Sequence, residues 1–507
     1  MSLLGVDVGT TGCKAVCFSS AGQPLATAYR EYDVRHPYPG WAELDTVDVW
    51  QKVQETIREA VGQADVGGDR VRALAVSSLG EAVVPVSRDR EILGPSILNF
   101  DVRGEDYLPA LGDTLSDAAL YAINGNTLGN HYGLTKLMWI RDHRPELYEN
   151  AYKFLPWSSF VGFMLGADAV VDYSLANRLL LFDLAAEDWS EALLAWAELD
   201  REKLPRTAPS GALVGTVSAS MAEELGLDAG VRITTGAHDQ CANAVGCGVI
   251  APGQAVYGMG TFICVTPVFT SRPDPATMIA QGLNTEHHAV PGRYVSFIYN
   301  QGGSLVKWFR DTFAAEAHRQ ALAEGRSIYD TLFAELPDGP SGLVTLPYFT
   351  TTGPPEFVSD SRGVIAGLSL ETSRGAILAA IVEGATFYLR ACIEGLPKTG
   401  IGIRDFRATG GGSQSDRWLQ RSADILGRPM VRPTVTEAGA LGAAILAGVG
   451  SGHFDSFESG IETMVGLREV FTPDPAQQTR YAPWFDRYQR LWPLMRDYLQ
   501  ELATAAR

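Results

Sequence analysis

Two segments about half a chain apart share one pattern, in which an apolar run, a Gly-Thr turn and a second apolar run follow one another. The first is LLGVDVGTTGCKAVCF, residues 3–18, and the second is AVYGMGTFICVTPVF, residues 255–269. An internal repeat of this kind predicts two related domains that face each other across a cleft. Chance similarity between two short motifs is the alternative.

Length also favours two domains, because one hydrophobic core stops growing at roughly 250 to 300 residues and this chain has 507. We place the domains at residues 1–247 and 248–507. Around the first repeat, apolar spacing predicts strands at 3–8, 13–18, 24–32 and 71–79 and a helix over 45–61. This order is typical of the start of an α/β domain.

The second half continues the alternation of strands and helices. Residues 406–427 are predicted as a strand, a glycine turn and a helix, and the apolar periodicity of 484–502 predicts a helix that packs on the core. Ser413 and Thr434 each precede an acidic residue by three positions, a pattern that indicates two helix starts.

The charge balance restricts the partners of the chain. It carries 59 Asp and Glu against 41 Lys and Arg, a net charge of −18, and it has no basic stripe interleaved with aromatic residues. We therefore expect no nucleic acid and no membrane as partners. An anionic ligand would have to be held locally, by backbone N–H groups, helix N-termini or a metal ion.

The cysteines and the apolar stretches indicate a cellular location. The six cysteines fit no zinc-binding spacing, and Cys13 and Cys17 would lie about 13 Å apart along a strand, too far for a disulfide. Free thiols suit a reducing compartment. The N-terminus lacks a signal-peptide pattern, and the most apolar stretches, 375–382 and 440–450, are too short to cross a bilayer. We expect a cytoplasmic protein.

The turn between Asp7 and Lys14 suits a polyphosphate. A turn rich in Gly and Thr lets backbone N–H groups and hydroxyls approach phosphate oxygens, and an acid just before it can hold Mg²⁺ through the water shell of the ion. Lys14 could neutralise a phosphate or be a surface lysine on a strand. A plain hairpin turn, which Asp also favours, is the alternative for this motif alone.

Two further motifs stand at predicted junctions of a strand and a helix. Asp239 follows the apolar run VRITTG and precedes small residues, so it could cap a helix. It could also be a general base, because a helix N-terminus favours the ionised carboxylate. The three glycines before Ser413 permit close approach of a flat or anionic ligand, or serve only as a connection.

Together these motifs resemble the FGGY carbohydrate kinases, which belong to the actin-like, Hsp70-like and hexokinase-like ATPase group. DVGTT, an Asp after the middle strand, GMGT, and ATGGGS with SDRWLQ before EAGALGAAILAG occur in the family's order, and the resemblance runs from about residue 3 to residue 499. The resemblance implies an α/β fold with two actin-like (ribonuclease H-like) domains flanking a central cleft. It also implies ATP and Mg²⁺ as cofactors and is compatible with a homodimer.

The resemblance assigns roles residue by residue. Asp239 would be the catalytic base, and Asp7 would also hold the metal. The residues that would bind ATP are Asp7, Gly9, Thr10, Thr11, Lys14, Gly260, Thr261, Gly411, Gly412, Ser413 and Gln414. The residues that would bind the sugar are Glu81, Asp101, Arg103, His131, Tyr132, His238 and Gln240. His131 and His238 could instead be structural, and Asn99 stands where the family has Trp.

The expected reaction is transfer of a phosphoryl group from ATP to a terminal hydroxyl of a small ketose or polyol. A pentulose such as D-xylulose is favoured, because residues 120–140 and 172–180 resemble the pentulose kinases, whereas Gln240 resembles glycerol kinases. A glycerol-, erythritol- or aldonate-type kinase stays open. So does a non-enzymatic actin-like nucleotide switch, although a switch needs no convergent hydroxyl-binding groups.

Overall fold

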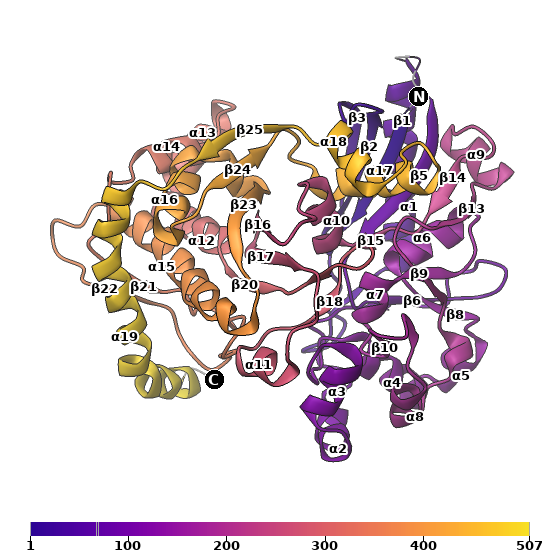
Figure 1. Cartoon of the computed structure of the whole chain (residues 1–507), viewed down its shortest axis with the longest axis horizontal. Helices are drawn as coiled ribbons and strands as arrows, with labels where there is room; N and C mark the ends of the chain where they lie inside the picture. Colours follow the sequence, from indigo (N-terminus) through magenta and orange to yellow (C-terminus); the bar gives the residue numbers. More distant parts are fainter. Residues whose placement is uncertain (1, 67, 69, 506–507) are drawn as a thin grey trace.

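The computed structural model describes residues 2–66, 68 and 70–505, and it shows two lobes, each built around one mixed β-sheet (Figure 1). In the first sheet the strand order is β13-β14-β5-β1-β2-β3, and β15 also pairs with β5. The strands are β1 (Ser2–Val8), β2 (Gly12–Ser19), β3 (Pro24–Glu31), β5 (Val71–Ser78), β13 (Leu213–Thr216), β14 (Arg232–Thr234) and β15 (Ala237–His238).

The sheet of the second lobe follows the order β18-β19-β17-β16-β23-β24-β25, with β20 paired to β17. Its strands are β16 (Gly253–Met259), β17 (Phe262–Phe269), β18 (Glu286–His287), β19 (Tyr294–Val295), β20 (Ile298–Gln301), β23 (Ile403–Thr409), β24 (Met430–Pro433) and β25 (Leu467–Phe471).

The two sheets repeat one topology, which confirms the internal repeat. In the first, β1 pairs antiparallel with β2 and parallel with β5, and β5 pairs parallel with β14. In the second, β16 pairs antiparallel with β17 and parallel with β23, and β23 pairs parallel with β24. The Gly-Thr turns join corresponding strands, β1 to β2 and β16 to β17.

The helices agree with the sequence in position and differ at some ends. The predicted helices correspond to α1 (Thr46–Val66), α16 (Asp416–Leu426), α17 (Ala438–Gly450) and α19 (Pro475–Ala505). The expected start signals were wrong in detail, because Ser415 caps α16 through its side chain, and Glu437 stands at the cap position of α17 without a side-chain hydrogen bond that caps the helix. All six cysteines are free, as expected.

One helix is longer than the apolar stretch inside it suggested. The stretch 375–382 lies within α15 (Arg374–Gly395). Among the described residues, 374–399 is long and apolar enough to cross a membrane by length and composition, which corrects the expectation that the stretch is too short. Of its most apolar window 72% is buried inside the second lobe, and a core helix passes the same test.

Helix α17 connects the two lobes by packing. It follows β24 of the second sheet, yet it packs against β1 and β5 of the first sheet and against α10 (Asp239–Gly246), as the yellow helix beside the indigo strands shows in Figure 1. The approach is close, because an added Cβ on Gly5 would lie 1.8 Å from the carbonyl oxygen of Ala440. A side chain at Gly442 would similarly meet the Ala242 carbonyl at 1.9 Å.

Replacing Gly5 by alanine should destabilise the protein by about 1 to 3 kcal/mol or more, because the helix has to move away from the sheet. The matched control is Gly62→Ala in α1, where nothing lies within 4 Å of an added Cβ. That variant should gain about 0.5 to 1 kcal/mol, since alanine favours a helix. Urea unfolding should give opposite shifts of the midpoint, and a Gly5→Ala midpoint at or above that of the wild type would contradict the close packing.

Candidate functional site

Asp239 lies where β15 ends and α10 begins, at the junction that the sequence predicts. The cap position belongs to His238, so capping the helix is not the role of the Asp239 side chain. Gln240 Nε2 donates to Asp239 Oδ1 at 3.2 Å, and 33% of the Asp239 side chain is exposed. Burial, followed by the negative charges of Asp7 and Glu81, raises the pKa of Asp239 to about 7. Such a carboxyl group can accept a proton near neutral pH.

Asp7, near the end of β1, is the acidic neighbour of Asp239. Ser77 Oγ donates to Asp7 Oδ1 at 2.7 Å. Burial raises the pKa of Asp7, and Lys14, which faces it in register on β2, acts in the opposite direction. Lys14 forms an ion pair with Glu437, which stands just before α17. Residues from both halves of the chain therefore meet beside Asp7.

The first Gly-Thr turn is held by backbone bonds. The Gly9 N–H donates to the Gly12 carbonyl at 2.9 Å, and the Tyr32 hydroxyl donates to the Gly9 carbonyl at 2.6 Å. Thr11 is exposed and Thr10 is half-buried. The turn thus keeps a fixed shape while its hydroxyl-bearing residues stay accessible.

The second Gly-Thr turn and the glycine segment lie together in the other lobe. Gly260 and Thr261 are exposed, and their carbonyls accept the N–H groups of Gly303 and Ser304, each at 3.0 Å. The segment Gly411–Gln414 is a short 3-10 helix that contacts β16.

The residue before this segment, Gly410, has a backbone conformation and surroundings that only glycine fits. Gly410 has a φ of 86°, and an added Cβ would lie 2.9 Å from the Met259 carbonyl. Ser413 is buried, with its hydroxyl donating to the Gly410 carbonyl at 2.7 Å, whereas Gln414 is exposed. Ser413 therefore shapes the segment, and the exposed backbone of Gly411 is available to a ligand.

These segments share one topological position. Asp7, Glu81 and Asp239 stand at or just after the carboxyl ends of β1, β5 and β15, which run parallel. The turn 260–261 and the segment 411–414 follow β16 and β23, which are parallel to each other in the second sheet. In open α/β sheets, ligands bind outside the carboxyl ends of the strands.

Glu81 belongs to a buried charge cluster that joins the lobes. Arg178 Nε donates to Glu81 Oε1 at 2.8 Å, and Arg178 Nη1 donates to Glu286 Oε1 at 2.5 Å. Glu286 lies in β18 of the second lobe. Burial acts against the charge on Arg178, but Glu286 and Glu81 outweigh it and hold its pKa above the usual range. We call Glu81, Arg178 and Glu286 the lobe-bridging triad.

The backbone of Glu81 is also unusual. Its φ of 63° is left-handed, a conformation that residues with a side chain rarely adopt. Strained backbone of this kind is concentrated at functional sites. The conformation and the position after β5 together mark Glu81 as a candidate ligand-binding residue.

The histidines proposed for the sugar lie in different surroundings. His238 is buried with its ring edge-on to Phe297, and burial, followed by the charge of Arg178, lowers its pKa. Its Nδ1 has no hydrogen-bond partner among the described residues, and its Nε2 lies 3.2 Å from Asp239 Oδ1. His131 is exposed as a residue, and its ring lies against that of Tyr132, with centroids 4.0 Å apart.

Tyr132 and Gln240 complete the set near Asp239. The buried Tyr132 hydroxyl donates to Asn126 Oδ1 at 2.8 Å, and its ring lies 5.1 Å from the Arg178 guanidinium carbon. Gln240 is half-buried beside Asp239. Electrostatic contacts therefore link Tyr132 to the lobe-bridging triad and the triad to Asp239.

Asp101 and Arg103 bind each other. Both Asp101 oxygens accept bonds from the Arg103 guanidinium, at 2.9 and 2.7 Å, and one also accepts the Ala42 N–H at 2.5 Å. Arg103 stacks on Trp41 with 3.9 Å between its guanidinium carbon and the ring centroid, and it also faces Trp139. In this geometry both side chains are committed within the protein, and their binding to sugar remains a prediction.

Sequence reasoning missed four residues beside this site: Ser77, Arg178, Glu286 and Glu437. For Arg178 there was a signal, since it is the one cation in the apolar segment DYSLANRLL and a buried charge needs a partner. No comparable pattern marks the other three, because each meets its partner only after distant segments are brought together.

Comparison with known proteins gives consistent results. The family description "FGGY family of carbohydrate kinases, N-terminal domain" matches residues 2–246, and the corresponding C-terminal domain matches residues 241–451. A glycerol kinase from Leptothrix cholodnii is 31% identical over 93% of this chain and 95% of its own length. A xylulose kinase from Bacillus subtilis is 26% identical over 98% of this chain and 97% of its own.

A solved structure agrees with these matches. The xylulose kinase from Rhodospirillum rubrum superposes with a TM-score of 0.86 at 28% identity, covering 98% of this chain and all of the other. The two-lobed architecture of this chain is therefore that of a known group of kinases.

Proposed function

Since the chain belongs to the FGGY family of carbohydrate kinases, we propose that it transfers the γ-phosphoryl group of ATP to a terminal hydroxyl of a small ketose or polyol. Members of this family are sugar phosphotransferases, with the two-domain actin-like fold and ATP as a substrate. Our proposal assigns sugar and phosphate binding and the catalytic base to residues 1–247 and nucleotide binding to residues 248–507. We also propose that the protein is cytoplasmic and forms a homodimer.

The observation that carries the proposal is the state of Asp239. Its carboxyl group has a pKa raised to about 7, lies within electrostatic reach of Asp7 and Glu81, and is partly open to solvent. A sugar hydroxyl bound there would donate its hydrogen bond to the carboxylate. As the oxygen attacks phosphorus, the proton passes to Asp239, which is the general-base step that a hydroxyl nucleophile needs.

The phosphate groups would lie between the two Gly-Thr turns. Backbone N–H groups and hydroxyls at 9–11 and 260–261 suit phosphate oxygens, and Lys14 supplies a positive charge. The adenosine would lie along 411–414. Positioning of this kind provides most of the catalysis in phosphoryl transfer, which needs little covalent help from the protein.

Asp7 would hold Mg²⁺ through the water shell of the ion. Among the described residues no group of three His, Cys, Asp or Glu side chains forms a metal cage. Mg²⁺ does not require one, since it keeps several waters and takes one or two carboxylates plus substrate phosphates. The negative charges of Asp7 and Asp239 repel each other, and a cation bound nearby would reduce this repulsion. When bound, the ion would neutralise charge on the phosphates.

On the sugar side, Glu81, His131, His238 and Gln240 are the proposed hydroxyl partners. Within the described part of the chain, Nδ1 of His238 has no hydrogen-bond partner and Arg178 binds only Oε1 of Glu81, which supports the assignment. We propose a pentulose such as D-xylulose as the acceptor. Glycerol is the second candidate, because the glycerol kinase from Leptothrix cholodnii is more similar in sequence than the xylulose kinase from Bacillus subtilis.

A coupled assay that follows ADP release tests the function. We expect release to depend on a sugar, with the highest kcat/KM for a pentulose in a panel of ketoses, polyols and aldonates. Preference for glycerol would move the substrate assignment to the second candidate. ADP release that no sugar stimulates would indicate a nucleotide switch and overturn the proposal.

A further inference from the structure

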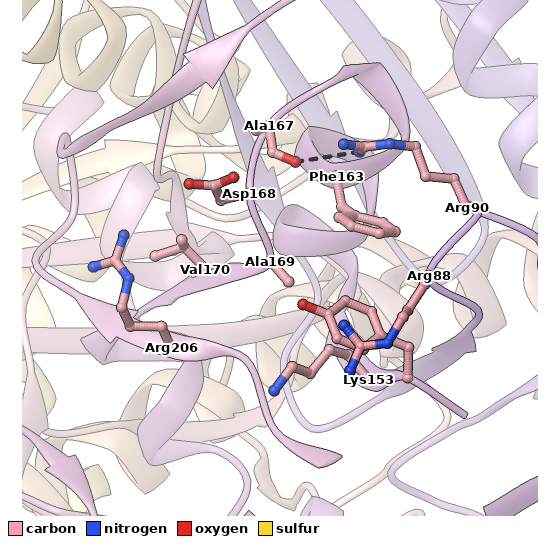
Figure 2. A pocket seen from close by; sticks show the side chains of 10 residues that line it. Arg88, Arg90, Lys153, Phe163, Ala167, Asp168, Ala169, Val170 and Arg206 are labelled. Carbon is pink, nitrogen blue, oxygen red and sulfur yellow. Dashed lines mark hydrogen bonds between the residues drawn. The ribbon is translucent and has the colours of Figure 1, made fainter. Parts of the chain in front are cut away.

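A polar cavity opens in the first lobe, and none of its lining residues belongs to the candidate site. Its volume is about 410 Å³. The walls come from the start of β8 (Lys153–Pro156), the segment after β6 (Val83–Val86), the end of α6 (Trp157–Leu165), and the first residues of the strands β9 (Val170–Asp172) and β12 (Arg206–Ala208). Figure 2 shows the side chains that line it.

The lining is strongly basic although the chain is acidic. Arg88, Arg90, Lys153 and Arg206 line the cavity with a single acid, Asp168. The whole protein carries a net charge of −18, so a chance patch of its surface would be acidic. Like charges repel one another, and gathering four of them around one hollow costs free energy unless something compensates it.

No carboxylate of the described residues provides that compensation by direct pairing. None of the four cations has a carboxylate oxygen within 4.0 Å, although most arginines elsewhere in the described chain form such ion pairs. Arg206 lies across the cavity from Arg88 and Lys153 in Figure 2. With no carboxylate of the described residues paired directly to them, these charges stay available to a ligand in the cavity.

Arg88 and Arg90 are held by contacts that leave their charge available. Arg88 lies over the Tyr152 ring at 4.4 Å and Arg90 over the Phe163 ring at 4.2 Å. The Arg90 guanidinium also donates to the Ala167 carbonyl at 3.2 Å, drawn as the dashed line in Figure 2. Aromatic rings and carbonyl oxygens orient a guanidinium without neutralising it.

Lys153 is held in the same manner. Its ammonium donates to the carbonyls of Glu202 and Leu204, at 2.7 and 2.8 Å, which leaves one of its three N–H donors free. Cations on both sides of the cavity, Arg206 on one and Lys153 with Arg88 on the other, suit an anion with more than one charged group.

We propose that this cavity binds a small multivalent phosphate-bearing anion. Guanidinium groups match phosphate oxygens in a bidentate manner, and a cavity of this size admits a sugar bisphosphate or a comparable metabolite. A nucleic acid is not indicated, because the basic residues surround one hollow and do not continue as a stripe. The negative charge of Asp168 would repel the anion and weaken its binding.

Inorganic pyrophosphate is the probe, titrated into the full-length protein by calorimetry at low salt. The variant Arg88→Ser with Arg206→Ser removes two exposed guanidiniums and should raise the Kd by about tenfold or more. Asp168→Asn should lower the Kd, because it removes the repelling charge. The matched control is Arg72→Ser with Arg490→Ser, two exposed arginines that do not line this cavity and should leave the Kd unchanged.

The proposed nucleotide site contains none of these residues, so pyrophosphate bound there would be insensitive to the pocket variants. Equal affinity in the Arg88/Arg206 variant and the wild type, or an equal loss in the control variant, would overturn the assignment. Absence of binding to the wild type would overturn it as well.

Discussion

Replacing Asp239 by asparagine should lower kcat by about 10²- to 10⁴-fold, the range that general acid–base catalysis contributes. Asparagine has nearly the same shape and cannot take up the proton of the attacking hydroxyl. The KM for the sugar should change little, because the surrounding groups remain. Steady-state measurement of ADP release at saturating ATP and sugar gives both constants.

The wild-type enzyme should show a matching pH dependence. Because burial and the charges of Asp7 and Glu81 raise the pKa of Asp239 to about 7, the base is protonated and inactive below that pH. We therefore expect kcat to rise with pH and to level off above about 7. The asparagine variant should lack this titration.

A stability measurement is needed to show that a lower kcat in Asp239→Asn comes from the missing base and not from unfolding of the variant. Since the carboxyl pKa is raised in the folded state, the folded protein binds more protons than the unfolded one between about pH 4 and 7, and stability falls as pH rises through this range. Asp239→Asn removes this effect, so its urea midpoint at pH 8 should not be lower than that of the wild type. Asp486→Asn, an exposed change on α19, should leave kcat unchanged. Wild-type turnover in Asp239→Asn would end the assignment.

Arg178→Met should destabilise the protein strongly, with a loss of about 3 to 5 kcal/mol in the free energy of unfolding. Arg178 is buried between Glu81 and Glu286, and methionine would leave two buried carboxylates without a counter-charge. Urea unfolding at pH 8 measures the effect.

Two comparisons make this result specific. Arg417→Met removes an ion pair whose partner Asp338 has a 96% exposed side chain, and it should cost less than about 1 kcal/mol. Adding Glu81→Gln and Glu286→Gln to Arg178→Met should restore part of the stability, because the unpaired charges are then gone. A small loss in Arg178→Met, or no recovery in the triple variant, would contradict the triad.

Local sequence signals predicted much of the fold. The Gly-Thr turns, the alternation of apolar residues and the small-residue run after Asp239 place β1, β2, β16, β17 and α10 correctly. Each of these features depends on neighbours a few residues away, which propensity and periodicity capture. The order of the motifs then indicated two similar lobes, and the repeated sheet topology confirms this.

Long-range pairing was not predictable in the same way. Packing of α17 on β1 of the other lobe requires a glycine at position 5, and its packing on α10 requires one at position 442, and neither glycine has a local signature. The triad joins residues from three separate segments, and its partners are set by tertiary structure alone. The Asp101–Arg103 pairing was likewise not predicted, because the motif suggested two separate ligand-binding side chains, and their binding to sugar stays a prediction.

The most direct test of the account is a rapid-quench single-turnover measurement of phosphoryl transfer between pH 5.5 and 8.5, with enzyme in excess over ATP and a saturating ketose. This isolates the chemical step from product release. For the wild type we predict a rate that rises with an apparent pKa near 7, and for Asp239→Asn a low rate that does not change with pH. Identical pH profiles and rates for the two proteins would contradict the claim that the Asp239 carboxylate accepts the proton of the attacking hydroxyl.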